Sequence, residues 1–176
     1  ALSSAASDVY KRQIRSCAPL ASFLAFYLHM IFPDVRQVQT NSSSEIFEQM
    51  IRITEDDVVI GISFPRYSMR TMKALEFANS RKAKVITITD SVHSPMNVYA
   101  ACTLIAKSDM ASIVDSLVAP LSVINALVVA LCMKRQADVK KTLESMEKLW
   151  DEYQVYSNDE INGLDDAPVS YTHLRA

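Results

Sequence analysis

The chain has 176 residues, a formal net charge of −2 and 49% apolar residues, which is ordinary for one globular domain with a sizeable core. The near-neutral charge leaves no basic footprint for broad nucleic-acid binding. Only two glycines occur, Gly61 and Gly163. This scarcity excludes the loops of dinucleotide-binding and Walker A sites, because both need several glycines within one turn.

The cysteines give no sign of a metal site. Cys17, Cys102 and Cys132 lack C-x-x-C spacing and have no nearby pair of histidines. The pattern predicts neither a zinc site nor a disulfide framework, and we expect no metal and no cofactor. Cysteines of this kind fit a reducing compartment, so the expected location is cytoplasmic.

Both ends of the chain look foreign to the rest. Residues 1–13 and 168–176 resemble translated sequencing-adapter read-through. We therefore expect 1–13 to be an artefact, 14–156 to form the domain, and 157–176 to be a polar tail that ends in artefact. The first strand of the domain would then be incomplete, and residues 9–15 could fill its place by accident.

The first half of the domain contains two helical patterns around one short strand. Apolar residues recur every three or four positions over 18–31, which predicts a helix. The stretch 34–39 alternates loosely and predicts a short edge strand. Residues 42–53 predict a helix that opens with a capping box of Ser42 and Glu45.

A strand, a polar turn and a helix follow, and the rest of the domain is organised around them. The fully apolar run 58–62 predicts a central strand buried on both faces. After the turn 63–68, helical spacing continues to about 81–82. Two further strands and two long helices are predicted over 84–88, 102–106, 112–135 and 137–153. Strands that alternate with helices predict an α/β fold with a parallel sheet.

In such a fold the strand-to-helix turns meet at the carboxyl edge of the sheet. Three turns carry hydroxyl groups there: Ser16 in the first, Ser63 and Ser68 in the second, and Thr89, Ser91 and Ser94 in the third. The positive end of the helix after the second turn favours an anion, and Arg66 adds a guanidinium suited to phosphate. We predict a small oxyanionic ligand at this edge. The alternative is that the serines only cap helices.

Three ionisable side chains near these turns admit two interpretations. Asp90 could line the ligand site or hold the third loop through an Asx-turn, and the Asx-turn is the more ordinary role. Glu45 and Glu48 are the candidates for a general base, although a helix cap and a solvated helix face account for them equally well. His93 is a loop histidine that we expect to meet only water.

The segment 117–133 is apolar nearly all round. Pro120, Ser122 and Asn125 interrupt it and no basic flank precedes it, so we expect no insertion into a membrane. A helix of this character is expected to contact the sheet on one side and a partner subunit on the other.

These residues together resemble a SIS (sugar isomerase) domain, in particular the effector domain of RpiR/MurR-type bacterial transcription regulators. The resemblance covers almost all of 14–156 and is strongest over 41–48, 62–71, 89–95 and 149–153. It implies a three-layer α/β/α, flavodoxin-like fold with five parallel strands in the order 2-1-3-4-5. It also implies a homodimer, through the 112–135 helix, and a phosphorylated sugar or amino-sugar as ligand.

The resemblance assigns the phosphate to Ser63 and Ser68, with Arg66 beside them and Ser16 or Cys17 contributing from the first turn. Thr89, Asp90 and Ser94 then belong to the sugar or its loop.

Two positions depart from the wider family. Pro65 and Arg66 replace a Ser-Gly pair, so the guanidinium would substitute for a lost donor. Cys17 stands where the family has a phosphate-binding serine.

The function implied is ligand sensing without catalysis, in which a phosphosugar shifts the dimer. DNA would be contacted only through an N-terminal helix-turn-helix domain that this sequence lacks. An aldose–ketose phosphosugar isomerase that uses Glu45 or Glu48 is the first alternative. A dimerisation module without a working pocket is the second.

Overall fold

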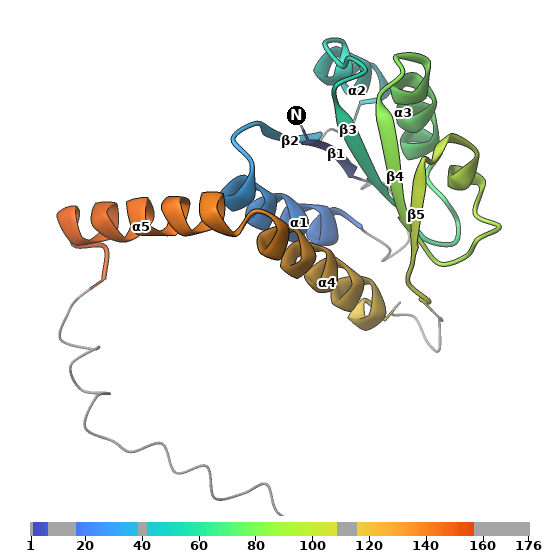
Figure 1. The fold of residues 1–176 in the computed structure, drawn as a ribbon. Coiled ribbons are helices and arrows are strands. Elements are labelled where there is room, and N and C mark those ends of the chain that lie inside the picture. Colours follow the sequence, from blue (N-terminus) through green and yellow to red (C-terminus); the bar gives the residue numbers. More distant parts are fainter. Residues whose placement is uncertain (1, 7–16, 39–41, 109–115, 157–176) are drawn as a thin grey trace, which may run out of the picture. The chain divides into compact units, whose positions relative to one another are not determined.

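The computed structural model describes residues 2–6, 17–38, 42–108 and 116–156, with only the backbone for 2–6 and Ser43 (Figure 1). The chain divides into two compact units, Ala1–Val139 and Lys140–Ala176. The first contains the sheet and the helices that cover it. The second contains most of the last helix.

One parallel sheet organises the first unit, with its strands in the order β2-β1-β3-β4-β5. The strands are β1 (Leu2–Ala6), β2 (Val35–Val38), β3 (Val58–Ile62), β4 (Lys84–Thr89) and β5 (Cys102–Ile105). This doubly wound order is the one expected, so the flavodoxin-like fold class is confirmed. The prediction that 34–39 forms an edge strand is confirmed as well.

The strand before the first helix comes from an unexpected place. Leu2–Ala6 lies between β2 and β3, and its backbone pairs with Val35–Val38 on one side and Val58–Ile62 on the other. Residues 9–15, which could have filled this position, lie outside the described residues. The adapter origin of 1–13 stays a prediction, but the sheet uses part of that segment as an interior strand.

Helices cover both faces of the sheet (Figure 1). They are α1 (Ala18–Ile31), α2 (Ser43–Met50), α3 (Met69–Ser80), the 3-10 helix η1 (Pro95–Tyr99) and α4 (Val118–Lys134). The last helix, α5 (Gln136–Glu152), belongs mostly to the second unit. One buried cluster joins α1 and α4 to one face of the sheet, and a second joins α2, α3 and η1 to the other. The three-layer architecture is therefore confirmed.

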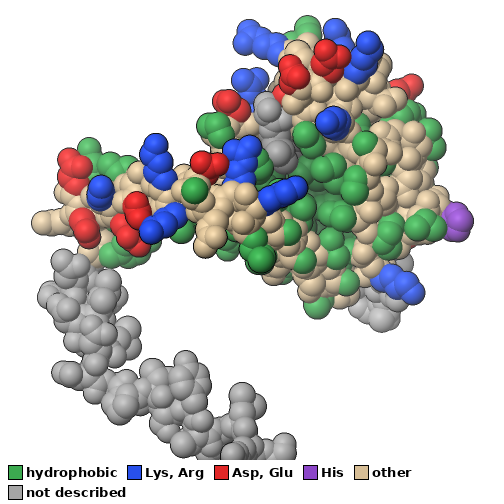
Figure 2. All heavy atoms as spheres, in the orientation of Figure 1, with side chains coloured by type: hydrophobic (Ala, Val, Ile, Leu, Met, Phe, Trp, Pro, Cys, Tyr) green, Lys and Arg blue, Asp and Glu red, His purple; other side chains and the backbone are tan. Residues whose placement is uncertain are grey.

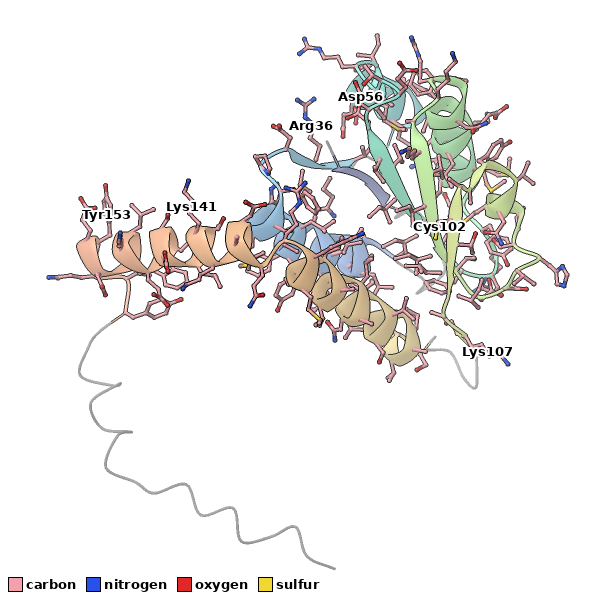
Figure 3. The ribbon with its side chains drawn as sticks, in the orientation of Figure 1. Arg36, Asp56, Cys102, Lys107, Lys141 and Tyr153 are labelled. Carbon is pink, nitrogen blue, oxygen red and sulfur yellow. The ribbon has the colours of Figure 1, made fainter. Side chains whose placement is uncertain are left out.

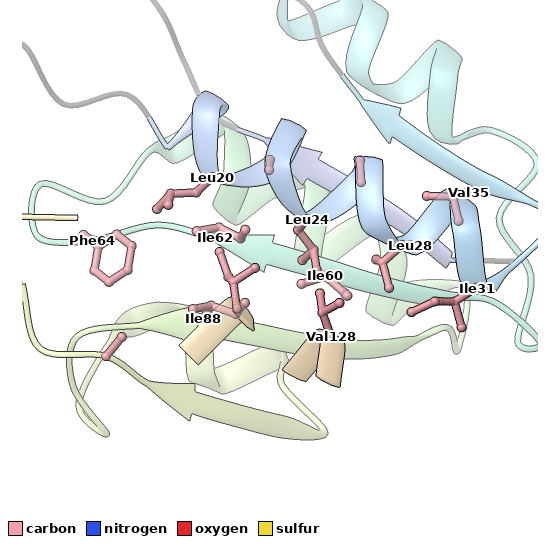
Figure 4. Packing of buried hydrophobic residues seen from close by; sticks show 14 residues of the cluster. Leu20, Leu24, Leu28, Ile31, Val35, Ile60, Ile62, Phe64, Ile88 and Val128 are labelled. Atoms are coloured by element: carbon pink, nitrogen blue, oxygen red, sulfur yellow. The ribbon is translucent and has the colours of Figure 1, made fainter. Parts of the chain in front are cut away.

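Alternate side chains of β3 enter the two clusters, as expected for a strand buried on both faces. Ile60 and Ile62 point into the α1–α4 cluster, where they meet Leu24 (Figure 4). Val59 points into the α2–α3 cluster. A Cβ at Gly61 would lie 2.8 Å from Leu75 Cδ2, so the glycine allows α3 to pack closely on the strand.

The Ser42 side-chain bond of the capping box predicted for α2 is absent. Ser42 occupies the N-cap position, yet its side chain makes no capping bond and its Oγ lies 2.8 Å from Ser44 Oγ. The helix also ends at Met50 rather than near 53. A turn follows, in which the Ile53 N–H donates to the Met50 carbonyl at 3.0 Å, and a second turn is closed by a bond of 2.8 Å from the Thr54 N–H to the Asp57 carboxylate.

The C-terminal helices agree with the sequence patterns. Helix α4 begins at Val118, whereas the predicted helix began at 112; residues 112–115 lie outside the described residues, and 116–117 are not helical. Helix α5 has no buried residue, and Trp150 packs edge-on against Tyr156 with ring centroids 5.4 Å apart. The tail from 157 lies outside the described residues. Among the described residues, no single helix is long and apolar enough to cross a membrane, although α4 and α5 taken together meet those criteria by length and composition.

Candidate functional site

The turn between β3 and α3 closes on the hydroxyl of Ser63. This residue is 4% exposed, and its backbone N–H donates to the Ile88 carbonyl of β4 at 3.2 Å. Its Oγ accepts a hydrogen bond of 3.3 Å from the Ser68 N–H. A hydroxyl that accepts one bond still has its own proton to donate. Ser63 can therefore donate to a ligand oxygen while it holds the turn.

Ser68 begins α3 as its N-cap, and its Oγ accepts a bond of 3.4 Å from the Thr71 N–H. The ordinary capping role is thus real. It does not oppose an anion site, since the Ser68 O–H also remains a donor. The first turn of α3 contains no acidic residue, so no carboxylate of the helix offsets its positive end.

Arg66 adopts a left-handed backbone conformation, with φ of 71°, and its side chain is exposed. This explains the glycine that the resemblance places here, because glycine adopts positive φ without steric cost. An arginine at such a position costs roughly 1–2 kcal/mol. The turn therefore carries a strained residue whose side chain is exposed to solvent.

The third turn is held by hydroxyl groups. Thr89 is fully buried, and its Oγ1 lies 3.0 Å from Ser94 Oγ and 3.2 Å from Asp90 Oδ1. The Asx-turn expected at Asp90 is wrong, since Asp90 accepts from side-chain hydroxyls and not from a backbone N–H. The Ser91 hydroxyl makes the turn instead, by accepting a bond of 3.1 Å from the His93 N–H.

The side chain of Tyr67 joins the second turn to the third. The Tyr67 hydroxyl donates to Asp90 Oδ1 at 2.8 Å, across 23 positions of sequence. Burial raises the pKa of Tyr67, and the bond to Asp90 raises it further. The structure therefore brings Ser63, Ser68 and Asp90 to one edge of the sheet, as the topology predicted.

Asn97 is a residue of this edge that the sequence pattern did not reveal. Its Nδ2 donates to the carbonyl oxygens of Ser91 and Val92, at 3.1 and 3.0 Å. Its Oδ1 accepts from the hydroxyls of Thr87 and Thr103, at 3.0 and 3.1 Å. The amide thus fastens the third turn to β4 and β5, and nothing in the local sequence marks an asparagine for that role.

The remaining candidate residues from the sequence are Ser16, Cys17, Glu45 and Glu48. Ser16 lies outside the described residues. Cys17 is the N-cap of α1, makes no capping bond through its side chain, and packs against the cluster that includes Phe64. Glu45 and Glu48 are both exposed on α2. In the described part of the chain, no group of three His, Cys, Asp or Glu side chains could hold a metal ion.

Residues 14–130 match the family model of the SIS domain. The chain belongs to the SIS domain family. No curated protein matches the sequence significantly. The family match begins after β1 and ends within α4, so it spans both turns of the candidate site.

Several solved structures share this SIS fold. The sugar isomerase domain of an RpiR transcription factor from Sphaerobacter thermophilus is 22% identical with a TM-score of 0.72, and the match covers 84% of this chain and 77% of that one. The Vibrio vulnificus NanR protein complexed with ManNAc-6P is 14% identical with a TM-score of 0.67, and the match covers 89% of this chain but 56% of NanR.

A third neighbour comes from Methanococcus jannaschii. It is the MJ1247 protein, whose structure is described as inferring a 3-hexulose-6-phosphate isomerase. It is 11% identical with a TM-score of 0.57, and the match covers 80% of this chain and 75% of that one. At these identities the likeness concerns the fold.

Proposed function

We propose that this SIS domain is the phosphosugar-binding effector domain of an RpiR-type bacterial transcription regulator. The observation that carries the proposal is the turn from Ser63 to Ser68. It presents a buried hydroxyl and the N-terminus of α3, with no carboxylate in the first turn of that helix. These are the donors that a phosphate needs.

The two ends of the ligand would meet different chemistry. Ser63, Ser68 and Arg66 provide hydroxyl donors and a cation for the phosphate, with Ser16 or Cys17 added from the start of α1. The third turn provides acceptors for sugar hydroxyls, from Thr89, Asp90 and Ser94. The complex of the NanR neighbour with ManNAc-6P supports a sugar phosphate as the ligand class.

In the proposed sensor the ligand changes the arrangement of a homodimer. Helix α4 offers a surface through which that dimer could form. Its buried side includes Ile124 and Val128, whereas Val118, Val129 and Met133 are 73%, 57% and 75% exposed. Figure 2 shows further hydrophobic side chains open to solvent on the face that it draws. We propose that the exposed stripe of α4 forms the homodimer interface. DNA would be bound through a helix-turn-helix domain outside this sequence. The proposed location of the protein is the cytoplasm.

Ligand binding is tested on the full chain by thermal shift and isothermal titration calorimetry. The ligands are ManNAc-6P, arabinose 5-phosphate, glucose 6-phosphate and inorganic phosphate. Ser63→Ala is expected to weaken sugar-phosphate binding by at least roughly tenfold, because a hydrogen bond to a charged group contributes about 1.5–3 kcal/mol. Ser80→Ala, at the exposed opposite end of α3, is the matched control. A folded chain that none of these ligands stabilises would refute the proposal.

The dimer is tested by sedimentation. Val129→Asp places a charge on the exposed stripe of α4 and is expected to convert a dimer into a monomer. Asn79→Asp adds the same charge to an exposed position of α3 and should leave the assembly unchanged. A wild-type monomer at all accessible concentrations would contradict an α4 interface.

An aldose–ketose phosphosugar isomerase is the second candidate, and the MJ1247 neighbour favours the wider class of phosphosugar isomerases, since its 3-hexulose substrate is a ketose. Glu45 or Glu48 would then move the proton of an enediol intermediate. Turnover of a bound sugar phosphate that is abolished by Glu45→Gln or Glu48→Gln would establish the enzyme. Binding without turnover supports the sensor.

A further inference from the structure

The Asp90 carboxylate is fixed at the candidate site by one of its oxygens only. Oδ1 receives the hydroxyls of Tyr67 and Thr89, at 2.8 and 3.2 Å. Among the described residues, no hydrogen bond reaches Oδ2. A carboxylate oxygen can accept two bonds. One face of Asp90 therefore remains able to accept a donor from a ligand.

The position of this carboxylate relative to the phosphate turn follows from the chain itself. Tyr67 immediately precedes Ser68, whose N–H closes the turn on Ser63. The Tyr67 ring spans the gap to Asp90, so the negative charge lies within one tyrosine side chain of the predicted phosphate. A sugar bound by its phosphate at the turn would extend past this charge.

We propose that Asp90 makes the site selective for sugar monophosphates whose other groups are neutral or cationic, and that it excludes ligands with a second anionic group. The excluded classes are phosphosugar acids and sugar bisphosphates. This inference rests on the proposed phosphosugar-binding function and adds the chemical class that the site accepts.

A fixed negative charge attracts hydrogen-bond donors and repels anions. A sugar hydroxyl or an ammonium group gains a charge-assisted hydrogen bond to Oδ2. A carboxylate or second phosphate at the same place meets a like charge at short range. Tyr67 and Thr89 hold the carboxylate, so it cannot rotate away to relieve the repulsion. Specificity of this kind comes from the repulsive element.

The raised pKa of Tyr67 agrees with this geometry, since burial first and the bond to the neighbouring Asp90 carboxylate second disfavour a tyrosinate. Tyr67 therefore remains a hydrogen-bond donor at neutral pH. The bond that orients Asp90 is then present under the conditions in which a ligand would be sensed.

The experiment compares ligands that share a phosphate and differ in charge elsewhere. Calorimetry on the full chain measures the dissociation constants of two groups of ligands. The monophosphates are glucose 6-phosphate, glucosamine 6-phosphate and ManNAc-6P, and the double anions are 6-phosphogluconate and fructose 1,6-bisphosphate. Inorganic phosphate gives the baseline. The wild type is expected to bind the best monophosphate at least roughly tenfold more tightly than either double anion.

The decisive variant is Asp90→Asn, which keeps the size of the side chain and an oxygen that can accept from Tyr67. It is expected to reduce that tenfold preference to about twofold or less, and to weaken glucosamine 6-phosphate more than glucose 6-phosphate. Asp56→Asn is the matched control, because Asp56 lies in the exposed loop before β3, at the end of the sheet opposite Lys107 (Figure 3). It changes the net charge equally and should leave the preference intact.

The outcomes separate this inference from the function on which it rests. If no sugar phosphate binds, the proposed function fails and the selectivity fails with it. If monophosphates and double anions bind equally well to the wild type, or if Asp90→Asn leaves their ratio unchanged, only the inference about Asp90 is overturned. Tyr67→Phe provides a second readout. Because it releases the Asp90 carboxylate, it should reduce the preference for monophosphates over double anions and leave the binding of inorganic phosphate unchanged.

Discussion

At the scale of single residues, Arg66 and Lys82 form a natural comparison. Both have left-handed backbones, with φ of 71° and 63°, and both are exposed. Lys82 lies where α3 ends in a Schellman motif, in which the Lys82 N–H donates to Asn79 O and the Ala83 N–H to Ala78 O. Its conformation serves only to end a helix. Arg66 has the same conformation at the opposite end of α3, beside the candidate phosphate.

Replacing each residue by glycine separates strain from function. Arg66→Gly and Lys82→Gly should each raise the free energy of unfolding, by up to about 1 kcal/mol. Glycine removes a left-handed penalty of about 1–2 kcal/mol but adds entropy to the unfolded chain. Only Arg66→Gly is expected to weaken sugar-phosphate binding, severalfold by calorimetry. Unchanged binding in Arg66→Gly would show that the guanidinium does not contact the phosphate.

Tyr67 predicts a dependence of stability on pH. Because its pKa in the folded protein is raised above the ordinary value of 10.0, the native state keeps a proton that the unfolded state loses. This contribution is complete below pH 10 and disappears as the pH rises through the folded pKa. Melting temperatures of the wild type and Tyr67→Phe should therefore converge above about pH 10. Tyr153→Phe, at an exposed position, is the control, and a constant gap between wild type and Tyr67→Phe would contradict the prediction.

At the scale of elements, η1 is coupled to the sheet through Asn97. The four hydrogen bonds of this amide fix its orientation, since Ser91 and Val92 offer only carbonyl acceptors to Nδ2. The short helix therefore acts as the support of the third turn. A substitution of Asn97 would therefore displace Asp90 and Ser94, without any direct contact between Asn97 and a ligand.

Truncation of this amide should be costly. Asn97→Ala removes the acceptor that the Thr87 and Thr103 hydroxyls share and leaves them only their contact with each other, and it is expected to lower the free energy of unfolding by about 1–3 kcal/mol. Asn79→Ala removes the same group from an exposed position of α3 and should change stability by less than about 0.5 kcal/mol. Chemical denaturation of both variants measures the difference, and equal stabilities would mean that water replaces the lost bonds.

At the scale of the whole molecule, the sheet depends on β1. This strand pairs with β2 and β3 and so joins the edge of the sheet to its centre. Without it β2 has no neighbour in the observed order. The backbone groups on one side of β3 would also lose their hydrogen-bond partners, which is costly in a buried strand.

Deletion of residues 1–6 should therefore abolish cooperative unfolding or lower the melting temperature by at least roughly 10 °C, on the scale of about 2–4 °C per kcal/mol for domains of this length. Removal of 157–176, which the sequence predicts to be a polar tail, is the control truncation and should leave the melting temperature unchanged. Circular dichroism on heating measures both. If the first truncation melts like the full chain, the strand at 2–6 is dispensable and the expected domain of 14–156 is sufficient.

Much of this architecture could be predicted from local patterns in the sequence. Helical periodicity located α1 at 18–31, and a continuous apolar run located β3 at 58–62, because burial on one or both faces leaves a pattern at neighbouring positions. The turn at Ser63 and Ser68 could be inferred for the same reason. Parallel strands place their carboxyl ends at one edge, so the grouping of these residues with Thr89 followed from topology.

Three features needed the tertiary structure, and each joins segments that carry no local mark of one another. The Tyr67–Asp90 bond spans 23 positions, and the bonds of Asn97 depend on where η1 meets β4 and β5. The strand at 2–6 is selected by the open position between β2 and β3. The sequence by itself determined the elements other than β1 and η1, and the edge where a ligand would bind. Only the folded chain decided which side chains meet there, because hydrogen bonds between distant segments form only after packing has brought them together.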